Sequence, residues 1–415
     1  MQAVHIILFL VFTLLFCYLI RKNKQFDHPV ISRGIFIGIF LLKIIAGLVY
    51  GYIYSQQAFV TSSDAWRVFH ASLPEYRLLL HDPLTFLKTS FIFEGDISYS
   101  NFTQAGSSYW NILKEVIIVK FEALLDVFSF GNYYVNLVIY SFLVLIGNNL
   151  FFRTLGMVFK ESPYLNLFAA FLVPSMVFWT SAVYKDGLLF ILMAVICYST
   201  MRWMSGNRSF LSWLFILIPA LAGLFLLRTY LAALVIPALL AWIIAEKTGV
   251  APLRIYLSVY ILGGLAVFLL RPVFDITSLM ASWQEAFLQL PANSAMPAKP
   301  LASGINGLIK NLPQSLNFAF LRPVLWENKG KQYLLFAFEL LVMQLLFVIS
   351  LFRGFSPDRR QLAFRLFCFC LAFTGCLFLG YTVNIIGALV RYRCIFYPFM
   401  FAAMLGKGKR RNSFM

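Results

Sequence analysis

Long apolar runs separated by short polar turns recur along this chain. A helix needs about 17–25 apolar residues to cross a bilayer, and eleven stretches have this character. The predicted spans are residues 3–20, 34–54, 133–152, 164–182, 186–204, 210–227, 230–246, 255–271, 333–352, 365–382 and 394–406. The last span is short. The two spans that meet at Lys185 have an alternative interpretation, a helical hairpin that does not fully cross the membrane. We therefore expect an all-α polytopic membrane protein, one domain over residues 1–415, with about 11 (10–12) transmembrane helices.

The composition supports this fold class. Hydrophobic residues make up 61% of the 415 residues and charged residues 12%, whereas a soluble domain is about 45–50% apolar and about 25% charged. A soluble globule needs a polar surface that this chain cannot supply. The six cysteines lie in apolar runs and the four histidines are scattered, so neither a disulfide framework nor a histidine-built metal site is expected. Soluble enzymes, secreted disulfide scaffolds and disordered proteins are excluded.

We predict that the net charge of +17 reflects the orientation of the chain in the membrane. Basic residues concentrate in cytoplasmic loops of membrane proteins. With the N-terminus outside, the predicted cytoplasmic segments and their flanks hold 18 Lys and Arg residues, and the short outer turns hold four. The cytoplasmic segments are 21–33, 153–163, 205–209, 247–254, 353–364 and 407–415. We expect a multi-pass membrane protein with the C-terminus cytoplasmic, the lipid bilayer as a partner and no nucleic acid.

Two long loops interrupt the spans, and both are predicted to lie outside. The first, residues 55–132, ends in an amphipathic stretch in which charges recur three, four or seven residues apart. That spacing is typical of a helix lying in the membrane interface. The second, residues 272–332, contains an amphipathic run from Leu279 to Leu290. Each outer loop is therefore expected to carry an interfacial helix.

Polar residues at the outer ends of the spans are the candidates for chemistry. The short outer turns contain four cations, although such turns normally avoid them. The candidate phosphate-binding residues are Lys185, Arg228, Arg391 and Arg393, with Arg322 from the second loop. Their excess indicates an anion, and a phosphate at the membrane surface fits it. The alternative is that each cation anchors a helix end among lipid headgroups.

Acids and aromatic residues complete the candidate site. Asp64 follows the second span, and Asp186 begins the fifth. Glu94 and Asp96 are reserve acids in the same loop as Asp64, and Trp66 and Tyr109 are candidate platforms for a sugar ring, with the interfacial aromatic belt as the alternative. Lys43 and Glu339 lie inside spans, where a charge needs a partner or a wet cavity. We expect them to pair with each other or to belong to a lipid-phosphate groove.

Several short motifs carry a family resemblance. They are the outer Asp64 with its interfacial helix, the segment from Pro174 to Gly187, Leu-Arg-Thr-Tyr230, Phe-Leu-Arg-Pro323 with Trp326-Glu327, and the segment from Val390 to Pro398. This pattern resembles the GT-C class of integral-membrane glycosyltransferases, above all bacterial members encoded with surface-polysaccharide genes. The resemblance implies a polyprenyl-phosphate- or diphosphate-linked sugar donor and location in the inner membrane of a bacterium. It also implies that the sugar is transferred on the outer face of that membrane to a glycan or lipid acceptor.

The same resemblance assigns residues. It makes Asp64 the essential acid and Asp186 a second acid, which would hold a divalent cation (Mg or Mn) if one is used. Two departures are an extra helix before the Asp-bearing loop and a single Asp64 in place of an acid pair, so metal dependence stays open.

The residues themselves support sugar transfer, because a carboxylate can take the proton of an acceptor hydroxyl. A phosphate leaving group needs cations rather than a general acid. For Asp64 the alternative is a helix cap for the segment beginning at Ala65. Two other functions stay open: an O-antigen-type polysaccharide polymerase or ligase, and a lipid-linked glycan flippase or transporter.

Overall fold

The computed structural model describes residues 3–56, 63–93, 109–327, 333–352 and 358–405. The described residues are helical and form no sheet. Nine of their helices are long and apolar enough to cross a membrane. These are α1 (Ala3–Lys22), α2 (Arg33–Ser55), α7 (Tyr133–Val158), α10 (Lys185–Met204), α11 (Phe210–Leu227), α12 (Thr229–Lys247), α13 (Pro252–Leu269), α16 (Leu334–Phe352) and α17 (Arg359–Thr382). The chain is an all-helical multi-pass membrane protein.

A tenth span results if a bent pair counts as one. In this pair, α18 (Ile386–Arg393) and α19 (Tyr397–Met404) meet at an angle of 55°. Pro398 stands at the beginning of α19, where its missing N–H costs no helical hydrogen bond. The predicted span 394–406 is therefore one arm of a broken helix, and the count of nine or ten reaches only the lower end of the predicted range.

The predicted span 164–182 is also broken. It consists of α8 (Pro163–Leu167), the π-helical turn η2 (Phe168–Leu172) and α9 (Pro174–Trp179). Pro174 favours extended backbone in the residue before it, and Val173 is extended, with ψ of 115°. The three short helices connect α7 to α10.

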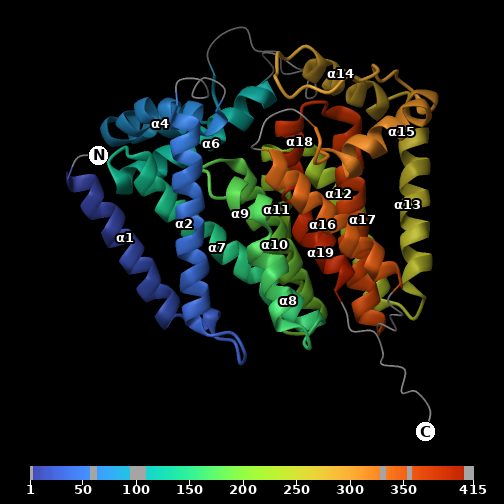
Figure 1. The fold of residues 1–415 in the computed structure, drawn as a ribbon, viewed down its shortest axis with the longest axis horizontal. Helices are drawn as coiled ribbons and strands as arrows, with labels where there is room; N and C mark the ends of the chain where they lie inside the picture. Colours follow the sequence, from blue (N-terminus) through green and yellow to red (C-terminus); the bar gives the residue numbers. More distant parts are fainter. Residues whose placement is uncertain (1–2, 57–62, 94–108, 328–332, 353–357, 406–415) are drawn as a thin grey trace.

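The helices of both long loops gather at one end of the bundle, which we call the loop face (top of Figure 1). The first loop contributes α4 (Asp64–His81), α5 (Pro83–Lys88) and α6 (Tyr109–Ser129). The second contributes α14 (Ile276–Leu288) and α15 (Ile305–Leu321). The two predicted amphipathic helices are thus present, as α6 and α14, and α4 and α15 add to them. Which side of the membrane the loop face meets stays a prediction.

The opposite end of the bundle is held together by the beginning of α17. Arg359 donates to the carbonyls of Ala245 and Val250, at 2.7 and 3.1 Å. Gln361 donates to the Val158 carbonyl at 3.3 Å. Because α7 ends at this face and α10 begins at the loop face, the broken segment between them joins the two faces of the bundle.

Two buried charges, Lys43 and Glu339, stabilise the broken segment. The predicted pairing of these two charges with each other is not found. Glu339 of α16 accepts from the backbone N–H and the hydroxyl of Ser175, at 3.0 and 3.1 Å. Lys43 of α2 donates to the Thr180 hydroxyl at 2.9 Å. Ser175 lies in the first turn of α9 and Thr180 caps its end. A carboxylate at a helix N-terminus and an ammonium at its C-terminus both complement the helix dipole, so Lys43 and Glu339 act as caps supplied by neighbouring helices.

Candidate functional site

Four charged side chains meet at the loop face, and we call them the ion cluster: Asp64, Asp186, Arg228 and Arg391. Arg391 joins both acids, with Nε 2.6 Å from Asp186 Oδ2 and Nη1 2.9 Å from Asp64 Oδ2. Arg228 Nη2 lies 2.8 Å from the other oxygen of Asp186, Oδ1. The cluster therefore brings together segments that lie as many as 327 positions apart in the sequence.

The two acids of the ion cluster differ in exposure. The side chain of Asp186 is 0% exposed, and each of its oxygens accepts from one arginine. The side chain of Asp64 is 34% exposed, so a ligand can reach its carboxylate. Both acids are paired with arginines, but only Asp186 is fully buried, so Asp186 fixes the two arginines. Asp64 is the acid whose side chain remains partly accessible.

Local structure explains why these side chains face one another. Ser63 caps α4 by accepting from the Trp66 N–H at 3.5 Å. Asp64 is the first residue of α4, so its carboxylate does not serve as the cap. At the beginning of α10, Gly187 allows close packing on α7, because a Cβ there would collide with the Tyr140 hydroxyl. That packing holds Asp186 in the bundle.

Aromatic rings enclose the two arginines. The Arg391 guanidinium lies 4.4 Å from the ring centre of Tyr184 and 5.9 Å from that of Trp179. The Arg228 guanidinium lies 4.0 Å from the ring centre of Tyr392. Cation–π contacts of this kind hold a guanidinium in place while leaving its edge N–H groups available for hydrogen bonds.

Further charges surround the ion cluster. Arg67 Nη2 lies 3.3 Å from Asp64 Oδ1 and 3.5 Å from Glu115 Oε1. The Lys185 ammonium lies 5.2 Å from the ring centre of Tyr184 and makes no salt bridge within the described residues. The four cations Arg67, Lys185, Arg228 and Arg391 thus outnumber the three carboxylates Asp64, Glu115 and Asp186. The excess positive charge suits an anionic ligand.

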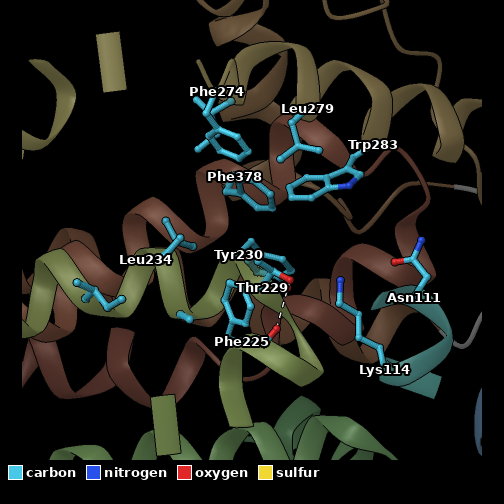
Figure 2. Close-up of a pocket in the computed structure, with 14 residues that line it drawn as sticks. Asn111, Lys114, Phe225, Thr229, Tyr230, Leu234, Phe274, Leu279, Trp283 and Phe378 are labelled. Atoms are coloured by element: carbon cyan, nitrogen blue, oxygen red, sulfur yellow. Dashed lines mark hydrogen bonds between the residues drawn. The ribbon is translucent and has the colours of Figure 1, made fainter. Parts of the chain in front are cut away.

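An apolar cavity of about 550 Å³ adjoins the ion cluster. It lies between α6, α12, α14 and α17, and Tyr230 links it to the cluster because the Tyr230 hydroxyl accepts from Arg228 Nη1 at 3.3 Å. Tyr230 stacks on Phe378, and the ring of Trp283 meets Phe378 edge-on. Figure 2 shows these rings along one wall, with Lys114 and Asn111 of α6 as polar lining residues.

Two of the predicted phosphate-binding arginines lie away from the ion cluster. Arg393 is 1% exposed and donates to the carbonyls of Ala319 and Arg322, both at 2.8 Å. It stands two residues after Arg391 in α18, and residues two apart point to different sides of a helix. Arg393 therefore holds the end of α15. The Arg322 side chain pairs with Glu327 in the second loop.

The predicted sugar platforms also serve packing. The Trp66 indole donates to the Gly51 carbonyl at 3.3 Å and stacks on Tyr133, which fastens α4 to α2 and α7. Tyr109 begins α6 and donates to the Phe91 carbonyl at 3.1 Å. The reserve acids Glu94 and Asp96 lie outside the described residues.

The donor set of the ion cluster does not fit a divalent cation. Three or more metal-ligating side chains gather nowhere in the part of the chain that the structure describes. The carboxylate oxygens of Asp64 and Asp186 already face guanidinium groups, which would repel Mg or Mn.

Some residues around the ion cluster carry only weak signals in the sequence. Arg67 stands three residues after Asp64, the spacing of neighbours on one helix face, but it becomes informative only once α4 is known. Tyr184 precedes Lys185 directly, and Lys114 and Glu115 stand out only as charges on an amphipathic helix.

The fold is that of an all-helical multi-pass membrane protein, and its ion cluster lies at the loop face of the bundle. No family model matches this chain, and no curated protein or solved structure matches it either.

Proposed function

We propose that the protein is a glycosyltransferase that uses a polyprenyl-phosphate- or diphosphate-linked sugar and transfers the sugar to a glycan or lipid acceptor. The observation that carries the proposal is the ion cluster together with the charges around it, Arg67, Glu115 and Lys185. This site is partly exposed, has one excess positive charge and lies next to an apolar cavity. A charged site beside an apolar cavity suits an amphipathic ligand with an anionic head and a hydrocarbon chain. The resemblance to the GT-C class points the same way. We infer that the loop face meets the outer side of a bacterial inner membrane.

The chemistry divides among the residues of the site. Asp64 is the base that takes the proton of the acceptor hydroxyl, because it is the accessible acid. Arg228, Arg391 and Lys185 stabilise the negative charge that develops on the departing phosphate. Asp186 positions the two arginines through both of its oxygens.

The ion pair between Asp64 and Arg391 links donor binding to the availability of the Asp64 carboxylate. Arg391 Nη1 occupies Asp64 Oδ2 in this structure. A donor phosphate that recruits the Arg391 guanidinium draws it away from this oxygen, which can then accept the proton of an acceptor hydroxyl. Donor binding thus frees one oxygen of the base.

A polymerase or ligase of the O-antigen type is the second candidate. One observation favours it: both oxygens of Asp64 accept from arginines, Arg67 and Arg391. In such an enzyme the arginines act on a lipid diphosphate, and Asp64 only positions them. A flippase or transporter has less support, because the charges converge on one face.

The test is sugar transfer by purified Asp64→Asn from a lipid-linked donor. Loss of the general base should slow turnover about 10²–10⁴-fold. Because Ser63 provides the cap of α4, the variant should fold normally. Asp82→Asn is the matched control, since Asp82 caps α5 at the same face and outside the ion cluster.

Two results would decide against Asp64 as the base. Turnover of Asp64→Asn within a few-fold of the wild type would remove Asp64 from catalysis and favour the polymerase or ligase. Equal loss in both variants would indicate a general effect on the first loop.

A further inference from the structure

The end of α4 and the short helix α5 carry a group of exposed apolar side chains, which we call the apolar patch. Its members are large hydrophobic residues that are 56–71% exposed: Leu80, Leu84, Leu87, Phe91 and Ile92. None of the five belongs to a membrane span. Exposed apolar surface that gathers in this way marks a site of contact with a membrane or a protein, so the patch requires a partner.

The inner side of α5 is fixed to α6 by one buried lysine. Lys120 is 6% exposed and donates to the Phe86 carbonyl at 2.9 Å and the Thr89 hydroxyl at 2.8 Å. Its ammonium also lies 2.6 Å from Glu75 Oε2 of α4 and 4.1 Å from the ring centre of Phe86. These contacts join α4, α5 and α6, and they keep the apolar patch on the outer surface.

Contacts with the span α7 set the depth of this layer of helices. Ser72 of α4 donates to Asp126 Oδ2 at 2.5 Å, and Asn136 of α7 donates to Asp126 Oδ1 at 2.6 Å. Asn136 lies in the first turn of α7, which begins at Tyr133. The middle of α4 therefore lies level with the first turn of a span, where the hydrocarbon of a bilayer gives way to headgroups. Figure 1 shows α4 beside the upper end of α2.

Basic residues border the apolar patch. Arg77 of α4 and Lys88 of α5 are exposed. Asp82 is the single acid between them in the sequence, and it caps α5 by accepting from the Thr85 N–H at 3.1 Å. An apolar surface with a basic border is typical of segments that lie in a membrane interface and attract anionic lipids.

We propose that the apolar patch inserts into the membrane leaflet at the loop face, with Arg77 and Lys88 at anionic lipid headgroups. The nine spans require a bilayer around the bundle, and the patch meets that bilayer at interfacial depth. The 18 residues of α4 extend about 27 Å, and Asp64 lies at the other end of this helix. The leaflet and the ion cluster thus hold opposite ends of α4. This inference does not depend on the reaction that the protein catalyses.

Spin labels on the patch report its surroundings. Nitroxide labels are attached to Leu84→Cys and to Leu87→Cys in protein reconstituted into vesicles of phosphatidylcholine and phosphatidylglycerol. Their collisions with oxygen, which concentrates in lipid, are compared with their collisions with a water-soluble nickel chelate. The ratio of the two should be several-fold higher than for a label at Glu285→Cys, an exposed position on α14 of the loop face. Unsubstituted protein gives the background from its own six cysteines.

Two outcomes would overturn insertion. Patch labels that meet the nickel chelate as often as the Glu285→Cys label does would place the patch in water. Labels protected from both reagents would show that protein covers the patch, from a second copy of this chain or from another partner.

The headgroup contacts are tested by lipid charge. The label at Leu84→Cys should lie deeper in vesicles that contain phosphatidylglycerol than in vesicles of phosphatidylcholine alone, because the anionic headgroups attract Arg77 and Lys88. Adding Lys88→Gln should reduce this difference in depth. Equal depth in the two kinds of vesicle would overturn the assignment of the two basic residues to anionic headgroups.

Discussion

The buried charges of this protein are used in two different ways. In the ion cluster, charges of opposite sign bind one another, and the side chain of Asp64 stays partly exposed. Around α9, Lys43 and Glu339 bind neutral partners, the Thr180 hydroxyl and the Ser175 backbone and hydroxyl. Both of these side chains are almost fully buried, at 1% and 6% exposure.

The difference separates binding from support. A charge that caps a broken helix satisfies dipoles of the protein itself and offers nothing to a ligand. Arginines held by a buried carboxylate and by rings keep unused N–H groups in a fixed direction, as a binding site requires. In this protein, clustered charges with partial exposure therefore indicate a binding site. An isolated buried charge whose partners are neutral groups of the protein indicates a structural role.

The largest effect on stability is expected for Asp186→Asn. Removing this carboxylate leaves Arg228 and Arg391 buried without their shared partner, and breaking a buried ion pair costs about 3–5 kcal/mol. The free energy of unfolding in detergent should fall by that amount, and donor binding should weaken as the guanidinium groups move apart. An Asp186→Asn protein with wild-type stability would show that the arginines do not depend on Asp186.

A smaller, pH-dependent effect is expected at Glu122 of α6. Glu122 is as buried as Asp186, at 0% exposure, but its oxygens have no hydrogen-bond partner among the described residues. Burial, and then the charge of Asp126, raise the pKa of Glu122 well above 4.5. An acid with a raised pKa in the folded state holds its proton more tightly there, so stability is greatest below pH 4.5 and falls as the pH rises toward the folded-state pKa.

Glu122→Gln tests this dependence. In the window above pH 4.5 the wild type should lose about 1.4 kcal/mol per pH unit relative to the variant. Thermal unfolding of both proteins at several pH values gives the comparison, and Glu285→Gln on α14 serves as a control at the same face. A constant difference across the pH range would mean that Glu122 is ionised and has a partner.

Much of the fold follows from hydrophobic periodicity, and the exceptions have physical causes. Apolar length predicts the spans, but it does not distinguish a continuous helix from the segment between Pro163 and Thr180, where proline and a π-helical turn break the hydrogen-bond pattern. The helix α4 is expected only through the alternative role of Asp64 as a cap, because its polar sequence matches no span. The cap is Ser63, so α4 begins at Asp64 and not at Ala65.

The candidate site is predicted in part for a similar reason. Asp64, Asp186, Arg228 and Arg391 stand at the outer ends of predicted spans, and the bundle brings those ends together. Arg393 shares that position in the sequence but turns to the carbonyls of α15, because only helical phase separates it from Arg391. Which charges pair also depends on how the helices pack, and the sequence pattern does not give this packing. The expected contact between Lys43 and Glu339 was therefore wrong.

The smallest effect on stability is expected for Lys43→Met, which tests the contrast between the two groups of charges directly. Thr180 donates its own hydroxyl to the Met176 carbonyl at 2.6 Å, so it keeps that hydrogen bond when Lys43 is removed. Methionine fills a similar volume, so the packing of α2 on α9 is kept. The helix-dipole interaction that is lost is worth about 0.3–1 kcal/mol.

We therefore expect the free energy of unfolding of Lys43→Met to stay within about 1 kcal/mol of the wild type. Arg391→Met is the matched substitution in the ion cluster. It leaves Asp186 with one arginine in place of two, so the buried carboxylate is only partly compensated and about 3–5 kcal/mol is lost. Unfolding of the two methionine variants in the same detergent gives the comparison. Equal losses would show that a capping charge and a clustered charge contribute equally to stability. The distinction between support and binding, on which the assignment of the ion cluster depends, would then be removed.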